Sequence, residues 1–417
     1  MRVTFRTFES GAGDCIFLVI KDAEGHSHHL MVDCNVLTDD IKAFIREDLG
    51  KRIDTLIVTH IDSDHANGIT KLLRSPEFAD LQIGQILFNG FQPQTEQTQA
   101  LPQNIKEKLE TVAQLLPPTV DEAFLKTNGM DAACLITELN KHPQWKAVWR
   151  KEPIMEGEFI SLGEEGKWGM LRFLSPTQNA LVSLLHEVKL EYARRLSAAP
   201  PDGDFEDQDK YFELMLRLAE LRERPSCVRK TCAIAITKGL LERYAITDGD
   251  ERSVTLANKA SIAFCWEGGV DHKRILMMGD AVSSQVVKAL KDIDDNPLWF
   301  EAVKVSHHGS KHNTSVDFCK RVNSSHFFLT GGKEGEGPHI ETIAKIAKLP
   351  LLDGQKRREL HYNHDKGISI WSKLTNENTQ QLMSNYHLFL NTTNIYEFEE
   401  CVARYYKDVE STEREKQ

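Results

Sequence analysis

Four side chains of the kinds that bind metal ions lie within six positions of one short stretch. His60, Asp62, Asp64 and His65 follow the apolar, β-branched run Ile53–Thr59, which predicts a buried strand. Alternate residues of an extended segment share a face, so the first three ligands can converge on one point while the second histidine turns toward another. Mixed imidazole and carboxylate ligands suit Zn, Mn or Fe better than Ca. The stretch therefore predicts a transition-metal site; the alternative, a polar loop with helix-capping aspartates, explains the spacing poorly.

The spacing of these ligands resembles a known signature. His-x-Asp-x-Asp-His is similar to the His-x-His-x-Asp-His motif of the metallo-β-lactamase fold hydrolases, with Asp62 where most members carry a histidine. It looks like the variant in the soluble lactamase-like domain of ComEC-type competence proteins and their free-standing relatives, which the resemblance links to nuclease activity. The resemblance covers roughly residues 1–90 and 155–346. Further segments agree in order along the chain, and they are Val32–Asn35, Asn258–Ser261, Met278–Ala281, Lys304–Ser310 and Gly337–His339.

The resemblance implies an α/β fold, an αββα four-layer sandwich with helical insertions. Residue patterns agree with two such halves. In the first half, strands are expected at Val3–Phe8, Cys15–Ile20, Ser27–Val32, Ile53–Thr59 and Gln85–Phe88, with a helix at Ile41–Asp48 capped by Thr38 or Asp39. In the second, strands are expected at Gly157–Leu162, Met170–Leu174, Ser261–Cys265, Arg274–Met278, Phe300–Val305 and Phe327–Leu329.

We predict a hydrolase domain over residues 1–372, followed by a polar, partly helical C-terminal extension over 373–417. Two insertions, near 91–150 and 177–230, have no counterpart in the minimal domain. Helical periodicity appears in them at Ile105–Leu116, Asp131–Lys141, Leu181–Leu196 and Tyr211–Leu221. We expect them to narrow the entrance to the site, or to contact a second subunit or a partner protein. Trp145 and Trp149 are either stacking surfaces for bases or buried core residues.

The resemblance also implies roles for the site residues. Asp33 would orient the motif loop, and Asp280, after a strand and a glycine, would bridge two metal ions through its two oxygens. Asp64 would bind metal and orient the attacking water, while His308 and His339 would protonate the leaving group or hold the oxyanion. Of the adjacent pair, His307 is the better ligand candidate, although the sequence does not decide between it and His308. The expected ligands are His60, Asp62, Asp64, His65, Asp280, His307 and His339, holding two divalent ions, Zn or Mn.

Other histidines are weaker candidates. Classical members carry one more ligand histidine before the bridging aspartate, and here only His142 and His186 are available, both in predicted helical insertions. Without that histidine the first site is richer in carboxylate, which favours Mn over Zn. Two further groups have suggestive spacing: His26, His28 and His29, expected in a solvent-facing turn, and His361, His364 and Asp365, expected near a substrate.

Composition limits the cellular setting and the partners. The chain has 417 residues, a charged fraction of 27% and a hydrophobic fraction of 41%, as in globular proteins. No apolar run is long enough to span a membrane, the first ten residues do not form a signal-peptide pattern, and eight scattered cysteines indicate reduced thiols. We therefore expect a cytoplasmic protein. A net charge of −11 argues against holding nucleic acid by bulk attraction, although metal ions or a local basic groove could still do so.

The function expected from these observations is a metal-dependent phosphodiesterase or nuclease. A dinuclear centre activates water and stabilises charge on the attacking and leaving oxygens, which suits DNA, RNA or a nucleotide. One alternative is hydrolysis of a small ester, amide or lactone by the same centre. Another is a non-catalytic interaction protein, although such a protein has no use for six or more converging ligands.

Overall fold

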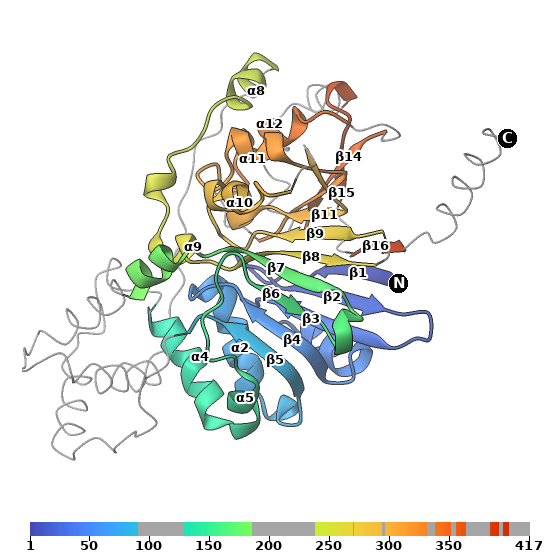
Figure 1. Ribbon diagram of the computed structural model, residues 1–417, viewed down its shortest axis with the longest axis vertical. Helices are drawn as coiled ribbons and strands as arrows, with labels where there is room; N and C mark the ends of the chain where they lie inside the picture. The colour runs from blue at the N-terminus through green and yellow to red at the C-terminus, as the bar shows by residue number, and fades with distance from the viewer. Residues whose placement is uncertain are drawn as a thin grey trace, which may run out of the picture.

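The computed structural model describes residues 1–90, 129–185, 238–269, 271–293, 297–331, 338–351, 356–363, 384–391 and 395–399. In these ranges two β-sheets pack against each other, and helices cover the outer face of each sheet (Figure 1). The first sheet has the strand order β16-β1-β2-β3-β4-β5, and the second β15-β14-β13-β11-β9-β8-β7-β6. The predicted αββα sandwich is therefore confirmed.

The first half begins with an antiparallel meander and continues with parallel strands. Its strands are β1 (Arg2–Thr7), β2 (Ile16–Lys21), β3 (Ser27–Val32), β4 (Arg52–Val58) and β5 (Gln82–Phe88). Its helices are α1 (Asp39–Ala43), the π-helix η1 (Phe44–Asp48), α2 (Ser63–Arg74), the 3-10 helix η2 (Pro76–Phe78), α4 (Gly129–Lys141) and α5 (Pro143–Val148). Thr38 caps α1, because its side-chain oxygen accepts a hydrogen bond from the Ile41 N–H at 3.4 Å.

The second half follows the same order: β6 to β9 are antiparallel, and the strands from β9 onward are parallel. Its strands are β6 (Phe159–Ser161), β7 (Met170–Ser175), β8 (Ala263–Gly268), β9 (Lys273–Met277), β11 (Ala302–Lys304), β13 (His326–Leu329), β14 (Arg358–Tyr362) and β15 (Leu388–Asn391), with β10 (Leu298–Phe300) and β12 (Val322–Ser324) forming a separate pair. Its helices are η4 (Glu164–Gly166), α8 (Lys238–Tyr244), η6 (Glu251–Ser253), α9 (Leu256–Lys259), α10 (Ser283–Ala289), η7 (Ser306–Gly309), α11 (Val316–Arg321) and α12 (Ile340–Ala347).

The core between the sheets holds the two halves together. Alternate residues of β1 point toward the second sheet, and Phe5 packs against Phe328 of β13 with ring centroids 4.1 Å apart and planes tilted by 33°. Ile57, Phe264 and Trp266 are buried in the same cluster. Each fully buried side chain of this size stabilises the fold by about 1.5–3 kcal/mol, so the sheets form a rigid platform for the loops at their edges.

The C-terminal region differs from the prediction of a polar, partly helical extension. β15 adds an edge strand to the second sheet, and β16 (Ile395–Glu399) pairs with β1 at the edge of the first. The two strands are short, and β16 turns only Tyr396 and Phe398 toward aromatic neighbours. These strands span only four and five residues, and they lie within a polar segment. Any alternation of apolar and polar residues is too short there to predict a strand from the sequence.

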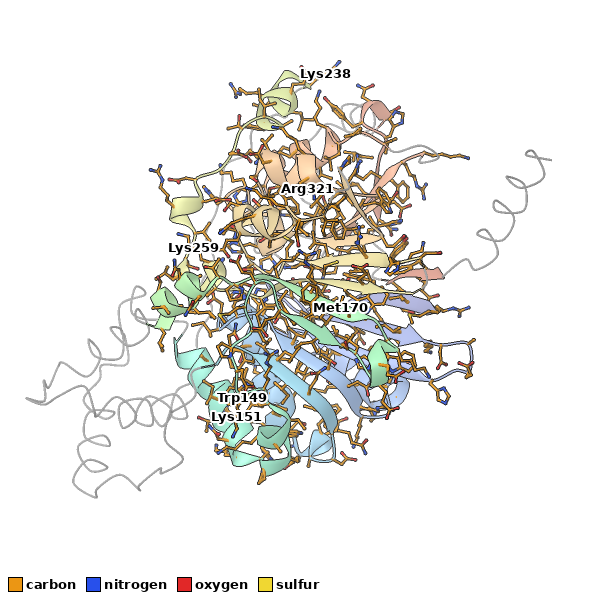
Figure 2. All side chains as sticks on the ribbon, in the orientation of Figure 1. Trp149, Lys151, Met170, Lys238, Lys259 and Arg321 are labelled. Atoms are coloured by element: carbon orange, nitrogen blue, oxygen red, sulfur yellow. The ribbon has the colours of Figure 1, made fainter. Side chains whose placement is uncertain are left out.

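The described part of the first insertion belongs to the core. The predicted helix Asp131–Lys141 is confirmed as α4, which contacts α2. Trp145 and Trp149 are 1% and 5% exposed, and their indole N–H groups donate to the Leu81 and Phe88 carbonyls of the first half. Figure 2 shows Trp149 at the first half of the molecule. Of the two alternatives for these tryptophans, burial in the core is confirmed, and neither ring is available to stack on substrate bases.

Several predictions fall beyond the described ranges. The helices expected at Ile105–Leu116 and Tyr211–Leu221 lie outside them, as do His186, His364 and Asp365. Of the helix expected at Leu181–Leu196, only residues 181–185 are described, and they are helical.

The N-terminal histidine cluster is not a solvent-facing turn throughout. His28 and His29 lie in β3 and are 5% and 7% exposed. His28 contacts the Thr55 hydroxyl at 3.1 Å, and only His26 of the three is exposed. The strand was predicted at these bounds, and only the exposure of the two imidazoles was wrong, because residue type does not show that a polar side chain will be buried.

Candidate metal centre

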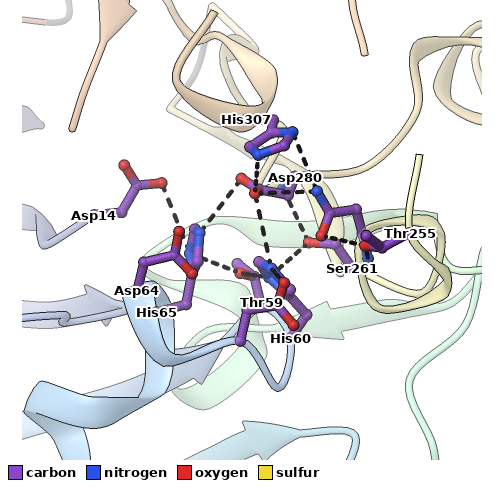
Figure 3. A network of polar contacts seen from close by, with 12 residues as sticks. Asp14, Thr59, His60, Asp64, His65, Thr255, Ser261, Asp280 and His307 are labelled. Atoms are coloured by element: carbon purple, nitrogen blue, oxygen red, sulfur yellow. Dashed lines mark hydrogen bonds and ion pairs between the residues drawn. The ribbon is translucent and has the colours of Figure 1, made fainter. Parts of the chain in front are cut away.

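The centre lies where the ends of β4, β9 and β11 meet. His60 follows β4 by two residues, Asp280 follows β9 by three, and the turn η7 after β11 carries His307 and His308. Because these strand ends belong to both sheets, the centre sits at their shared edge, and its side chains point toward one another (Figure 3). This is the edge at which open α/β sheets place their functional loops.

A first group of ligand-type atoms surrounds one oxygen of Asp280. The Nε2 atoms of His60 and His307 lie 3.8 and 3.7 Å from its Oδ2. The Oδ2 atom of Asp62 lies 3.7 Å from His60 Nε2. These contacts link two imidazoles and two carboxylates in pairs, although neither Asp62 nor His307 belongs to a ligand cluster of the described residues whose atoms all lie within 4.8 Å of one another.

A second group surrounds the other oxygen of the same carboxylate. His65 Nε2 lies 3.4 Å from Asp280 Oδ1, and His308 Nε2 lies 3.6 Å from Asp64 Oδ2. Ligand atoms of His65, Asp280 and His308 all lie within 4.8 Å of one another, as do those of His60, Asp64 and His65. Asp280 therefore stands between the two groups with one oxygen toward each, the arrangement that a bridging carboxylate requires.

Each of the four histidines has its other ring nitrogen, Nδ1, in contact with an oxygen. His65 Nδ1 donates to Asp33 Oδ2 at 2.7 Å, and His308 Nδ1 donates to the Thr330 carbonyl at 2.8 Å. The remaining contacts are His60 Nδ1 with the Thr59 hydroxyl at 3.0 Å and His307 Nδ1 with Asn313 Oδ1 at 3.1 Å. A proton on Nδ1 leaves Nε2 as a lone-pair donor, which is how outer partners orient metal-binding histidines.

The centre fits a pair of divalent ions. Four of its converging atoms are buried and have no hydrogen-bond partner among the described residues: His60 Nε2, His65 Nε2, His308 Nε2 and Asp280 Oδ1. A buried polar atom left without a partner costs on the order of 1–3 kcal/mol. Cations placed between these atoms would satisfy all four, and the mixed nitrogen and oxygen donors suit Zn or Mn.

Local backbone geometry makes the convergence possible. His307 and His308 both have left-handed backbones, with φ values of 45° and 52°, which are uncommon for residues other than glycine. Gly279, with φ of 49°, precedes Asp280, and a Cβ atom there would meet the Ser261 hydroxyl oxygen at 2.6 Å. Gly13 lets the N-terminal turn approach the motif loop, since its Cβ would lie 1.7 Å from the Asp64 carbonyl oxygen. The centre therefore depends on strained and closely packed backbone.

The sequence did not indicate a role for two further charged residues of the centre, Asp14 and Lys304. Both are 1% exposed; their ammonium and carboxylate groups form an ion pair, and Lys304 Nζ also lies 3.7 Å from Asp280 Oδ1. Although burial alone would raise it, Lys304 and His308 hold the pKa of the Asp14 carboxyl well below its usual range. A lysine inside the apolar strand Phe300–Val305 was the signal that could have revealed this pair.

The charges of the centre shift its histidines in opposite directions. Burial and the neighbouring His65 lower the pKa of His60 to about 3. Burial would also lower that of His308, but Asp14 and Asp64 raise its pKa to about 10. In the metal-free protein His308 therefore carries a proton at neutral pH, and a metal ion would have to displace it.

The structure brings together six of the seven predicted ligands, and adds His308 to them. The seventh, His339, caps the N-terminus of α12, and its backbone N–H donates to the Gly309 carbonyl at 3.1 Å. His339 belongs to none of the ligand clusters of the described residues, but its buried Nδ1 has no hydrogen-bond partner among them. His142, the possible extra histidine, packs against Trp145 in the outer helical layer instead, with ring centroids 4.2 Å apart.

Comparison with known proteins agrees with this geometry. A family model described as the metallo-beta-lactamase superfamily matches residues 11–131. The matched segment contains Asp14, Asp33 and the whole motif loop from His60 to His65. The match and the ligand clusters together indicate a metal-dependent hydrolase domain. No curated protein matches the chain.

No helix of the described ranges is both long enough and apolar enough to cross a membrane.

Proposed function

We propose that the protein is a metal-dependent phosphodiesterase or nuclease that acts through a dinuclear centre. The observation that carries the proposal is the position of Asp280, one oxygen of which faces His60 and His307 while the other faces His65. Two divalent ions held on either side of this carboxylate would supply an activated water and stabilise negative charge on the reacting oxygens.

The assignment of ligands follows from the two groups. His60, Asp62, Asp280 and His307 would hold one ion, and Asp64, His65, Asp280 and His308 the other. This proposal gives both adjacent histidines a ligand role, where we had expected only one. His339 then remains the candidate proton donor to the leaving group, since it lies beside the η7 turn and has an unpaired ring nitrogen.

Exposure within the centre indicates the side from which a substrate approaches. The side chains of His307, Asp64 and Asp62 are 39%, 27% and 18% exposed, whereas those of His60 and His65 are at most 1% exposed. Asp64 is therefore placed both to contribute to the centre and to hold an attacking water in position. Asn258 reaches the same face, where its amide nitrogen lies 3.2 Å from His307 Nδ1.

A phosphodiester is favoured by the surroundings. A surface hollow of about 270 Å³ is lined in part by Lys259, Arg252 and Val282. Lys259 adjoins Asn258 in the chain, and Val282 lies two residues after Asp280. The lining also includes the carboxylate of Glu251, and Arg252 forms an ion pair with Asp250 at 2.9 Å. Lys259 and Arg252 would favour an anionic substrate portion. The carboxylate of Asp62 adds a hard oxygen ligand to the first group. Hard oxygen ligands favour Mn, an ion suited to phosphate chemistry.

Metal analysis followed by a substrate panel tests the proposal. The full chain would be stripped, reloaded with Mn or Zn, and assayed with bis-p-nitrophenyl phosphate, single-stranded DNA, duplex DNA, RNA and a lactone. We expect about two ions per chain at this centre, together with diester cleavage. Asp280→Asn should fold but lose at least roughly 100-fold in turnover, whereas the surface variant Asp292→Asn should not.

Three results would contradict the proposal: less than half an equivalent of metal after loading, normal turnover in a folded Asp280→Asn protein, or hydrolysis of the lactone alone. The last would establish the small-ester alternative.

A further inference from the structure

A second group of metal-ligand side chains lies at the opposite ends of the strands that lead to the centre. His326 begins β13, and Glu359 and His361 lie in the neighbouring strand β14. The parallel register pairs His326 with Glu359 and Phe328 with His361, so the three polar side chains share one face. Since β13 leads from His326 to the Thr330 carbonyl at the centre, the two groups are separated by roughly 13 Å of strand.

Their ligand atoms are spaced as one ion would hold them. His326 Nδ1 and His361 Nε2 lie 3.0 Å apart, and Glu359 Oε2 lies 3.9 and 3.8 Å from these two atoms. A tetrahedral ion with bonds of roughly 2.0–2.1 Å separates its ligand atoms by about 3.3 Å. Small movements of the side chains would therefore bring all three atoms onto one ion.

Neighbouring residues fix these side chains in place. Phe328 stacks on the His361 ring at 4.2 Å, and Tyr396 of β16 stacks on the His326 ring at 3.9 Å. Asn391 donates to Glu359 Oε2 at 2.9 Å and holds the carboxylate from the next strand. Such outer contacts are typical of the residues that orient metal ligands.

The site is screened from solvent but still accessible. The side chains of His326, Glu359 and His361 are 16%, 14% and 3% exposed, so an ion could enter past the first two. The group stands between the two sheets, because Tyr396 belongs to the first sheet and the ligands to the second.

We propose that His326, Glu359 and His361 form a binding site for a single ion of the Zn or Co class, independent of the main centre. Two imidazoles and one carboxylate match the preference of these borderline ions. The bound ion would tie β13 and β14 together beneath Tyr396 of β16, and so stabilise the contact between the sheets. The alternative arrangement is a metal-free hydrogen bond between the two histidines, which the spacing of 3.0 Å also permits.

Counting ions in a protein with a disabled main centre distinguishes these two arrangements. Full-length Asp280→Asn, loaded with Co²⁺ or Zn²⁺, should retain roughly one ion, with the Co²⁺ absorption of a tetrahedral nitrogen and oxygen site. Adding His361→Gln or, separately, Glu359→Gln should abolish that ion. Either substitution should also remove the increase in melting temperature that the ion causes in the Asp280→Asn protein.

The exposed His272→Gln substitution serves as the matched control and should change neither quantity, since that side chain is 76% exposed. The proposal is overturned if the Asp280→Asn protein binds no ion. It is equally overturned if the retained ion persists in a folded protein that also carries Glu359→Gln or His361→Gln. Neither result depends on whether the main centre cleaves phosphodiesters.

Discussion

At the scale of single residues, the two adjacent histidines of η7 serve different sides of the centre. Both have left-handed backbones, and their rings lie 5.7 Å apart at 65° to each other. His307 faces the group around His60, while His308 faces Asp64. The left-handed backbone strains each of these residues by about 1–3 kcal/mol. This conformation places the two consecutive side chains on opposite sides of the Asp280 carboxylate.

The first prediction concerns Asp33, which accepts hydrogen bonds from the Thr59 N–H, the Thr59 hydroxyl and His65 Nδ1, each at 2.7 Å. Asp33→Asn removes the charge that orients His65 while preserving the shape of the side chain. We expect zinc affinity, measured by competition with a chelator, to fall by about 10–100-fold. Asp54→Asn is the matched control, because Asp54 instead accepts from the His29 N–H. Equal affinities in the two variants would rule out the orienting role.

The second prediction concerns pH. Asp14 and Asp64 raise the pKa of His308 to about 10, against about 6.5 in an unfolded chain. Between these values the folded, metal-free protein holds a proton that the unfolded chain lacks, so this contribution to stability is complete below pH 6.5 and is lost as pH rises toward 10. The melting temperature of the metal-free protein should therefore fall between pH 7 and 9.

Metal binding should show the opposite trend. Because a metal ion displaces the His308 proton, its apparent affinity should rise over the same pH range. Calorimetry in buffers of different ionisation heat should detect proton release. His308→Gln should reduce this release but not abolish it, because, against the lowering effect of burial, Asp280 and Asp33 also raise the pKa of His65. Metal binding without proton release at pH 7 would contradict the proposed ligand role of His308.

At the scale of elements, the described part of the first insertion strengthens the fold. α4 contacts α2 and is tied to it by the ion pair between Arg74 and Glu138, whose atoms lie 2.8 Å apart. α5 contacts β5 and carries the buried Trp145. These helices therefore extend the outer layer of the first half.

The third prediction follows from that packing. Trp145→Ala should lower the free energy of unfolding by about 3–5 kcal/mol, because it empties a large site in the first core. Trp145→Phe, which mainly loses the hydrogen bond to the Leu81 carbonyl, should cost less than half as much. Urea denaturation measures both values. If Trp145→Ala instead left stability unchanged and altered substrate preference, the core assignment would be wrong.

At the scale of the whole molecule, the C-terminal strands complete both sheets. The chain adds β15 beside β14 and then β16 beside β1, so one short segment contributes an edge to each half. Phe398 packs near Trp266 across the sandwich, with ring centroids 6.5 Å apart. The segment therefore links the halves at a distance from the metal centre.

The fourth prediction tests this link by truncation. A chain ending at residue 394 lacks β16, and a chain ending at Glu399 retains it, so comparing the two isolates the strand. Loss of Tyr396 and Phe398 should destabilise the shorter chain by a few kcal/mol and expose the β1 edge to aggregation. Thermal melts and light scattering measure these effects, and metal content at the main centre should remain the same. Equal melting temperatures would show that β16 adds no stability.

The sequence alone predicted the sandwich, which the structure confirms, and suggested most residues of the candidate centre. Apolar runs predicted β1 to β5 to within a few residues, and the spacing of His60, Asp62, Asp64 and His65 predicted a metal loop, because both signals are local. Asp280 could be placed for the same reason: it follows a recognisable strand and a glycine.

Only the tertiary structure decided which atoms meet. His307 and His308 are neighbours in the chain, and their division between two groups depends on a backbone conformation that residue types do not reveal. Asp14 reaches Lys304 across 290 positions, and β16 reaches β1 across nearly the whole chain. Contacts at such separation arise from packing of the two sheets, and a local pattern carries no information about them.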